Sequence, residues 1–234
     1  MNYINLHAHS VYSDGRNTLE EHVFAQRKLG MTACVLTDHV YPEGYNFSLN
    51  TSKFIKQCEE AEKLMNFLGV PIILGIEVSI MRMEEINIFG REAIMEILRI
   101  KSKGIITHDD LVGIKNNYNC VMNYNHPMNP PAFVKAGCMD LLDGYEHIHQ
   151  CSFTFDEDSE NYKQFNCPPE FSSLVKLCNS DAHNTDALEW CFNEAEVPIT
   201  TEDELISYIK ERRQFKHIVL GKTTRYSEGG IILP

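Results

Sequence analysis

A short segment near the start of the chain brings together three side chains of the kind that bind metal ions. His7 and His9 are separated by one residue at the end of an apolar run, and Asp14 follows them, directly before a glycine. Successive side chains of a β-strand point to opposite faces, so the two imidazoles share a face if residues 3–9 form a strand. Two imidazoles on one face can bind one divalent cation. An Asp-Gly pair alone usually indicates only a turn.

Similar side chains recur along the chain, each near the end of an apolar run. Asp181 and His183 repeat the one-residue spacing, and Glu77 offers two oxygens that can bridge two ions. The candidate metal ligands are five imidazoles and three carboxylates: His7, His9, Asp14, His39, Glu77, His126, Asp181 and His183. This set exceeds what one ion needs, and zinc, manganese and iron all accept mixed nitrogen and oxygen ligands. We therefore expect two or three divalent ions (Zn, Mn or Fe).

Hydrolysis of a phosphoester is the chemistry that most naturally uses such a centre. Clustered ions can activate a bound water near neutral pH and hold a phosphoryl group during in-line displacement. The alternative is that each residue is structural, which is the interpretation we give to His22, His147, His149 and His217. For the whole set, that alternative would leave several buried charges poorly compensated, at considerable cost in free energy. The joint pattern therefore favours metal binding.

The elements that must position these side chains alternate between apolar runs and helical patterns, which favours a parallel α/β fold. The expected strands cover residues 3–9, 32–39, 70–79, 86–89, 120–127, 139–147, 174–183 and 217–221. The expected helices cover residues 18–30, 51–69, 91–104, 107–117 and 200–213. Thr18 and Glu21 have the spacing of a capping box at the start of the first helix, and Gly30 marks its end.

Most of the candidate ligands fall at the carboxyl ends of the expected strands. In parallel α/β folds these ends open on one face, where ligands bind, so residues distant in sequence should converge there. About seven such strand ends fit a closed barrel better than an open sheet, although periodicity alone does not decide closure. We therefore expect a distorted (β/α)7 barrel, similar to a TIM barrel, with the metal site at the C-terminal ends of its strands.

The properties of the whole chain limit its partners and its location. The length of 234 residues indicates one domain, 1–234, and the net charge of −12 argues against general binding to nucleic acids or anionic membranes. We expect no signal peptide and no membrane span, because polar residues interrupt the first apolar run and the longest apolar stretch is short. The eight cysteines include no C-x-x-C pair, as expected of reduced core residues in a cytoplasmic protein. Residues 156–170 are acidic and polar and indicate a surface loop.

The motifs HAHSVYSDG, TDH, GIE, NHP and SDAH occur in this order between residues 7 and 183. In this combination the chain resembles the PHP superfamily, named for polymerase and histidinol phosphatase, from residue 1 to about residue 190. The resemblance implies a distorted (β/α)7 barrel with a centre of two or three metals that hydrolyses phosphoesters. The implied substrate is a small phosphorylated molecule. A phosphomonoester, such as histidinol phosphate or a nucleotide, and a small phosphodiester both stay open.

The resemblance also implies a role for each candidate ligand. His7, His9 and Asp181 resemble the ligands of one metal, and Glu77 resembles a bridge from it to a second metal. His126 is similar to a ligand of the second ion. The ligands of the third ion would be Asp14, His39 and His183. Asp38, Asp181 and His183 are the candidate catalytic residues, and Asp38 would act by orienting an imidazole.

One position departs from the family pattern. Compact members carry a ligand His at the start of an H-hydrophobic-hydrophobic-G motif, whereas this chain has Asn87 in INIFG. An amide oxygen is a poor zinc ligand, so the second site would be weak unless another residue, such as His108, replaces the imidazole. His108 fits the start of a helix better, because it precedes Asp109 and Asp110.

The remaining candidates concern the substrate and the alternative function. Arg16, Arg82 and Asn87 are the candidate substrate-binding residues, since an arginine near the strand ends can bind a phosphate. A solvated surface arginine is the alternative for Arg16 and Arg82. Asn87 also favours a second function class, in which a non-catalytic, metal-binding barrel serves as a binding or regulatory module.

Overall fold

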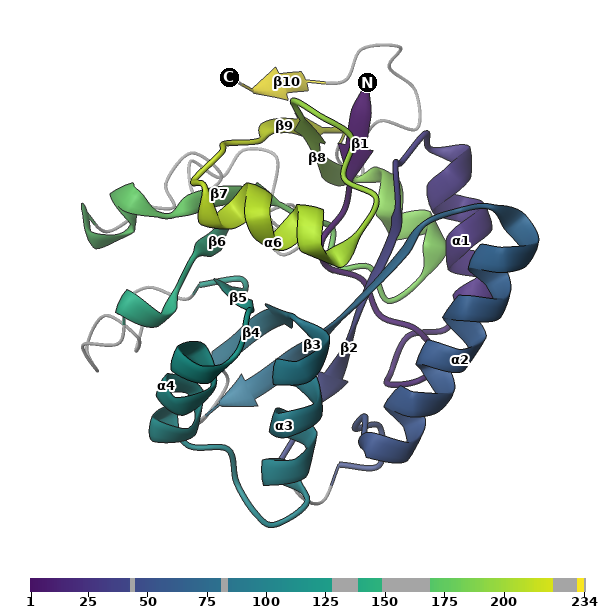
Figure 1. Ribbon diagram of the computed structural model, residues 1–234. Coiled ribbons are helices and arrows are strands. Elements are labelled where there is room, and N and C mark those ends of the chain that lie inside the picture. The colour runs from purple at the N-terminus through teal and green to yellow at the C-terminus, as the bar shows by residue number, and fades with distance from the viewer. Residues whose placement is uncertain (43–44, 81–83, 128–138, 149–168, 221–230, 234) are drawn as a thin grey trace, which may run out of the picture.

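The computed structural model describes residues 1–42, 45–80, 84–127, 139–148, 169–220 and 231–233. The helices are α1 (Leu19–Lys28), α2 (Thr51–Leu68), α3 (Arg91–Lys101), α4 (His108–Asn117) and α6 (Glu202–Lys210). The first strands are β1 (Asn2–Ile4), β2 (Cys34–Val40), β3 (Ile72–Ile80), β4 (Glu84–Phe89) and β5 (Val121–Tyr124). The others are β6 (Gly144–Ile148), β7 (Val175–Cys178), β8 (Cys191–Ala195), β9 (Lys216–Val219) and β10 (Ile231–Leu233). Figure 1 shows their arrangement.

The ends of the helices follow from local hydrogen bonding. The Thr18 hydroxyl accepts from the Glu21 N–H while Glu21 accepts from the Thr18 N–H, so the predicted capping box is confirmed. Thr107 caps α4 in the same way, and the prediction that His108 begins a helix is also confirmed. Gly69 ends α2 in the left-handed conformation, which glycine adopts without a steric penalty.

Six strands form one curled sheet in the order β2-β3-β4-β5-β6-β7. The pairs β2–β3, β5–β6 and β6–β7 are parallel, but β4 runs antiparallel to both of its neighbours. The prediction of a parallel arrangement is therefore wrong for β4. Only residues 81–83 separate β3 from β4, and a connection this short leaves no room for the crossover that a parallel pair requires.

A second sheet has the order β1-β8-β9-β10 and is antiparallel throughout. Neither β8 nor β10 was predicted. β1 ends at Ile4, earlier than the strand predicted for residues 3–9. Side-chain amides replace the regular ladder beyond this point, since Asn179 Oδ1 accepts from the Leu6 N–H and Asn5 Oδ1 accepts from the His7 N–H.

The segment 5–9 joins the two edges of the six-stranded sheet. On one side the Thr37 N–H of β2 donates to the Ala8 carbonyl (2.8 Å), and on the other the His9 N–H donates to the Ala182 carbonyl beyond β7 (2.9 Å). The first contact is a single hydrogen bond and the second belongs to an isolated bridge between Ala8 and Ala182, so neither extends a full strand. The described residues thus form an α/β fold with a curled half-barrel sheet, and the predicted closed (β/α)7 barrel is not confirmed.

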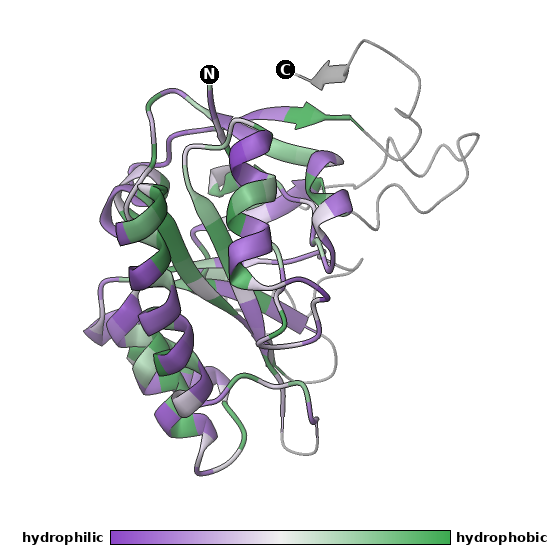
Figure 2. Ribbon diagram, turned by 90° about the vertical axis from the view of Figure 1, so that its right-hand side faces the viewer, coloured by the Kyte–Doolittle hydropathy of each residue, from purple (hydrophilic) through white to green (hydrophobic). Residues whose placement is uncertain are grey.

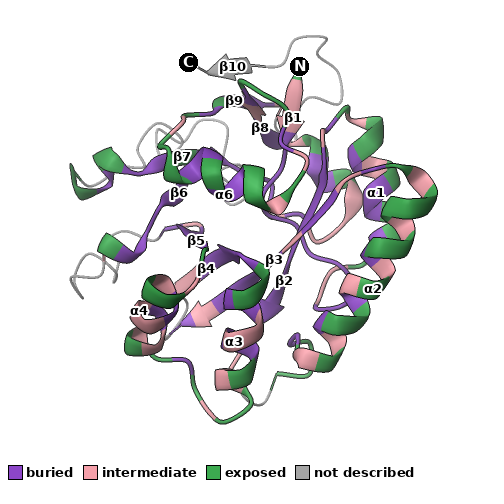
Figure 3. Ribbon diagram, viewed as in Figure 1, coloured by how far each residue is buried: buried purple, intermediate pink, exposed green. Residues whose placement is uncertain are grey.

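The two faces of this sheet differ in chemistry. On β4, Ile86 and Ile88 point outward into an apolar core beneath α3, while Asn87 between them is buried on the inner face. The same alternation places Glu77 inside and Ile76 outside on β3. Helices whose outer sides are hydrophilic and exposed cover the apolar face (Figures 2 and 3). The curled sheet therefore encloses polar groups, and the helices supply the apolar packing. Within the described part of the chain, no helix has both the length and the hydrophobicity to span a membrane.

Candidate metal centre

The first group of candidate ligands lies where segment 5–9 meets the residues after β7. His7 Nε2 and His9 Nε2 are 3.0 Å apart. Asp181 Oδ1 lies 3.3 Å from the first nitrogen and 3.1 Å from the second. Three ligand atoms thus lie close to one point, so the structure brings these three predicted residues together.

Glu77 connects this group to its neighbours. The side chain is fully buried on the inner face of β3. Its Oε1 atom lies 3.2 Å from His7 Nε2, and its Oε2 atom lies 3.4 Å from His9 Nε2. Oε2 is also 2.9 Å from Nδ1 of His39, which comes from the adjacent strand β2. His126 Nε2 also lies 3.3 Å from Oε1, so the two oxygens of one carboxylate face four imidazoles, a position in which a carboxylate can bridge two ions.

A second group gathers on the solvent side of His9. Asp14 Oδ1 lies 3.6 Å from His39 Nε2, and Asp14 Oδ2 lies 3.4 Å from His183 Nε2. The ligand atoms of His9, Asp14, His39 and His183 all lie within 4.8 Å of one another. Asp14 and His183 are 29% and 36% exposed, whereas the first group is almost closed to solvent. This side of the cluster is therefore the more accessible to solvent.

The third group contains a residue that the sequence analysis missed. His126 Nε2 lies 3.3 Å from Glu77 Oε1 and also 3.3 Å from Oε2 of Glu85, on β4. Glu85 Oε1 is 3.8 Å from His39 Nδ1, and His39, Glu77 and Glu85 form a further set within 4.8 Å. The alternation of β4 contained the signal, because Glu85 is two residues from the inward-facing Asn87.

Two residues of the centre have strained backbones. His126 has φ of 26° and Asp181 has φ of 50°, values that L-residues rarely adopt. Each follows the end of a parallel strand, β5 or β7, and each side chain points into the cluster. Strain of this kind persists where the surrounding structure imposes it, and it concentrates at functional sites.

Glu146 supports the cluster and was also missed. This fully buried carboxylate on β6 accepts from His7 Nδ1 (2.8 Å) and from the His126 N–H (2.8 Å). It also accepts from Asn179 Nδ2 (2.9 Å). The bond to Nδ1 leaves Nε2 of His7 facing the cluster, which orients an imidazole for metal binding. The sequence offered only a carboxylate within the strand predicted at 139–147, with no means of telling which face it occupies.

Asp38 was expected to orient an imidazole of the cluster, but its side chain does not contact the cluster. It lies on the face of β2 opposite His39 and accepts four hydrogen bonds, from the Ser10 N–H and hydroxyl, the Ser13 hydroxyl and Gln57 Nε2. Successive residues of a strand point to opposite faces, which is why the residue next to a cluster member is outside the cluster. Asp38 therefore anchors the turn that carries Asp14.

The candidate substrate-binding residues are dispersed. Arg16 is exposed beside His183, and its backbone N–H donates to the His183 carbonyl (2.9 Å). Asn87 is buried, and its Nδ2 atom donates to the Leu6 carbonyl (3.2 Å). Arg82 lies outside the described residues. Only Arg16 thus lies at the open side of the cluster among those that the structure describes.

Buried charges perturb one another throughout the inner part of the centre. Burial opposes a positive charge on His126, but the carboxylates of Glu77 and Glu85 raise its pKa to about 11. Burial also opposes the charge of Glu77, yet His7 and His39 hold the pKa of this carboxyl well below its usual value. The field of the carboxylates thus strongly favours a cation in this position.

Charged neighbours also shift the pKa values of the residues on the solvent side of the cluster. Burial opposes a charge on His183, but Asp14 and Asp181 raise its pKa to about 9. The pKa of Asp14 falls to about 2, because His183 and His39 outweigh the effect of burial. Burial together with the neighbouring His39 lowers the pKa of His9 well below 6.5, so that this imidazole favours its neutral, metal-binding form.

Unpartnered atoms show that the residues present fit a metal ion. His39 Nδ1 and Glu77 Oε2 approach to 2.9 Å, yet neither makes a hydrogen bond with any described residue. Asp14 Oδ1 is also buried without one. Ligand atoms around a tetrahedral zinc, at about 2.1 Å from the metal, are about 3.4 Å apart. The distances of 3.0 to 3.4 Å among His7, His9, Asp181 and Glu77 agree with that spacing.

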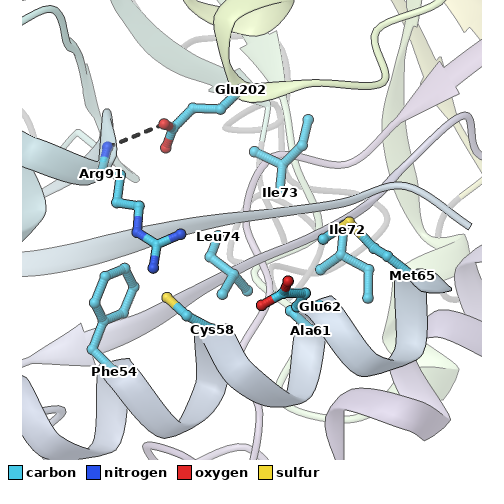
Figure 4. A pocket seen from close by; sticks show the side chains of 10 residues that line it. All are labelled: Phe54, Cys58, Ala61, Glu62, Met65, Ile72, Ile73, Leu74, Arg91 and Glu202. Atoms are coloured by element: carbon cyan, nitrogen blue, oxygen red, sulfur yellow. Dashed lines mark hydrogen bonds between the residues drawn. The ribbon is translucent and has the colours of Figure 1, made fainter.

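A pocket of about 400 Å³ lies elsewhere, between α2 and β3 (Figure 4). Phe54, Cys58 and Met65 of α2 line it together with Leu74 of β3. Its charged groups include Arg91, whose N–H donates to Glu202. The pocket shares no residue with the histidine cluster and lies on the outer, apolar face of the sheet.

Comparison with known families identifies the class of protein that this fold and cluster define. A family model described as the PHP domain matches residues 5–219. The chain therefore belongs to the PHP family. No curated protein matches the chain.

Solved structures of low sequence identity share the fold. PsfC from Pseudomonas syringae gives a TM-score of 0.60 at 14% identity, over 91% of this chain and 95% of PsfC. A proposed metal-dependent phosphoesterase from Bifidobacterium adolescentis gives 0.56 at 15% identity, over 89% and 95% of the two chains. A lesion-specific endonuclease from Pyrococcus furiosus gives 0.59 at 20% identity, and this chain spans 56% of its length. At these identities the similarity establishes the fold alone.

Proposed function

We propose that the chain is a metal-dependent phosphoesterase that acts on a small phosphorylated substrate. The observation that carries the proposal is the sharing of ligands between neighbouring groups. His9 belongs both to the set with His7 and Asp181 and to the set with Asp14 and His183. Groups that share residues would hold their ions close together, as in the two-metal centres that clamp a transferring phosphoryl group.

The proposed ligands divide into three sets. His7, His9 and Asp181 would hold one ion, Glu77 would bridge it to a second, and the remaining sets would use Asp14, His39, His183 and His126. Bound divalent ions supply Lewis acidity, which lowers the pKa of water and neutralises charge on a phosphoryl group. The chain's own residues orient the ligands, since the contact from Glu146 to His7 Nδ1 holds the ring in place.

The substrate would approach from the side of Asp14 and His183, the more exposed ligands. Arg16 lies beside His183 and is the proposed contact for a substrate phosphate. Asp181 and His183 at this edge are the proposed catalytic residues. The net charge of −12 supports a small substrate, since a long polyanion would be repelled. The match to residues 5–219 supports a single domain over 1–234.

A phosphoesterase assay with Mn²⁺ tests this proposal on panels of phosphomonoesters and small phosphodiesters. We expect turnover by the wild type and a loss of at least about 100-fold in His9→Ala and Asp181→Ala, because each removes a ligand. His108→Ala is the matched control, since this imidazole lies at the start of α4 outside the cluster. Undiminished turnover in both ligand variants would refute the role of this centre.

Asn87 favours a second candidate, a non-catalytic, metal-binding member that serves as a binding or regulatory module. Its buried amide occupies the place where the family pattern has an imidazole, and Nδ2 is engaged by the Leu6 carbonyl. Elemental analysis combined with the phosphoesterase assay separates the two candidates. Bound metal without turnover of any ester in either panel would support the module, and turnover that depends on His9 would exclude it.

A further inference from the structure

The inner face of β4 carries two polar side chains, at positions 85 and 87. Asn87 Nδ2 is engaged by a backbone carbonyl, and its Oδ1 atom makes no hydrogen bond with any described residue. Asn87 lies directly opposite Glu77 in the ladder. It therefore occupies the ligand position of the family pattern but offers a weak metal-binding atom.

Glu85 shares this face, one step of the strand alternation away. It pairs with Ser79 of β3, and the Asn125 N–H donates to its carbonyl (2.9 Å). Because β4 runs antiparallel, this step moves toward the carboxyl ends of β3 and β5, where His126 lies. The Glu85 carboxylate is thus level with His126, while Asn87 is deeper in the sheet.

The contacts of Glu85 are those of a ligand in the cluster. Oε2 lies 3.3 Å from His126 Nε2, and the same nitrogen lies 3.3 Å from Glu77 Oε1. Oε1 accepts from the Ser79 hydroxyl (2.5 Å) and lies 3.8 Å from His39 Nδ1, one of the buried atoms without a hydrogen bond. The Glu85 side chain is 16% exposed, so its charge requires a positively charged neighbour, which is either protonated His126 or a bound cation.

We propose that Glu85 supplies the ligand that Asn87 does not, and that Glu77, His126 and Glu85 together bind a divalent cation. This inference rests on the proposed metal centre and assigns one more residue to it. Two carboxylates and one imidazole offer more oxygen ligands than the one carboxylate and two imidazoles that a histidine at position 87 would give. Carboxylate oxygens are ligands that manganese prefers, so this set suits manganese better than a nitrogen-rich set would.

Metal content of the purified protein tests the inference without reference to activity. Wild type, Glu85→Gln and Glu84→Gln are equilibrated with Mn²⁺, separated from free metal by gel filtration and analysed by mass spectrometry. Glu84 is the matched control, because it adjoins Glu85 but accepts from the Tyr124 hydroxyl (3.0 Å). We expect Glu85→Gln to lose one equivalent, or to bind that ion at least about tenfold more weakly in a titration. Glu84→Gln should retain the wild-type content.

The double variant Glu85→Gln, Asn87→His completes the test. Restoring an imidazole at position 87 should recover the lost equivalent if the two positions serve the same ion. Circular dichroism checks that each variant is folded, and Glu85→Asp replaces Glu85→Gln if the latter is not. A wild type without bound Mn²⁺ would refute the metal centre itself. Equal metal content in wild type and Glu85→Gln, or equal losses in Glu84→Gln and Glu85→Gln, would overturn the role of Glu85 alone.

Discussion

Replacing Asp38 should destabilise the protein more than any change of an exposed carboxylate. The side chain is fully buried and accepts hydrogen bonds of 2.6 to 2.8 Å from Ser10, Ser13 and Gln57. Asp38→Ala leaves these donors without an acceptor, and hydrogen bonds to charged groups contribute about 1.5 to 3 kcal/mol each. Each buried donor left unpaired costs about 1 to 3 kcal/mol, and because such costs are not additive we expect about 3 to 5 kcal/mol in total. We expect the free energy of unfolding to fall by that amount.

Asp38→Asn should have a smaller effect, of about 2 kcal/mol. The amide oxygen can still accept from the Ser10 N–H and the Ser13 hydroxyl. Gln57 Oε1 has no hydrogen-bond partner among the described residues, so the Gln57 amide can turn and accept from the new amide group. This geometry therefore predicts that the free energy of unfolding falls in the order wild type, Asp38→Asn, Asp38→Ala.

Urea denaturation monitored by circular dichroism measures both values. The protein is kept in EDTA, so that lost metal binding adds nothing to the difference. Asp109→Asn, at an exposed position in the first turn of α4, is the control and should cost less than about 1 kcal/mol. A loss below 1 kcal/mol in Asp38→Ala would refute the anchoring role of this carboxylate.

Three other predictions concern metal binding and pH. Glu146→Gln should weaken metal binding by about 10- to 100-fold in a zinc titration, because the carboxylate no longer orients His7; unchanged affinity would contradict this. Removal of metal with EDTA should lower the melting temperature, and Mn²⁺ at 100 times its dissociation constant should restore about 2.7 kcal/mol of stability; a melting temperature indifferent to both would contradict it. Burial and the neighbouring His217 lower the pKa of His147 to about 4, so stability present above pH 6.5 should be lost as the pH falls toward 4. In His147→Asn the free energy of unfolding, measured with urea, should depend less on pH over this range. The difference from wild type should be below about 3 kcal/mol, because the ring is partly exposed; the same pH dependence in the variant would disprove the assignment.

Much of the centre could be predicted from the sequence, because its strongest signals are local or repeat at a fixed spacing. The H-x-H pair at residues 7 and 9 and the D-x-H pair at 181 and 183 each occupy one short segment. The position of Glu77 beside His39 followed from the common direction of β2 and β3, which pair these two residues directly. The helix ends at Thr18 and Gly69 were equally local, since a cap depends on only a few residues.

The tertiary structure decided what depends on strand direction and strand face. Residues 81–83 form a connection too short for a crossover, so β4 turned antiparallel and brought Glu85 level with His126. Glu146 reached His7 from β6, at a separation of 139 residues that no local pattern encodes. Asp38 adjoins His39 in sequence, yet strand alternation placed it on the opposite face. The amino-acid sequence by itself thus determined which residue types could bind metal. Only the pairing of distant strands decided which of them lie close enough to share an ion and which support those side chains by hydrogen bonds.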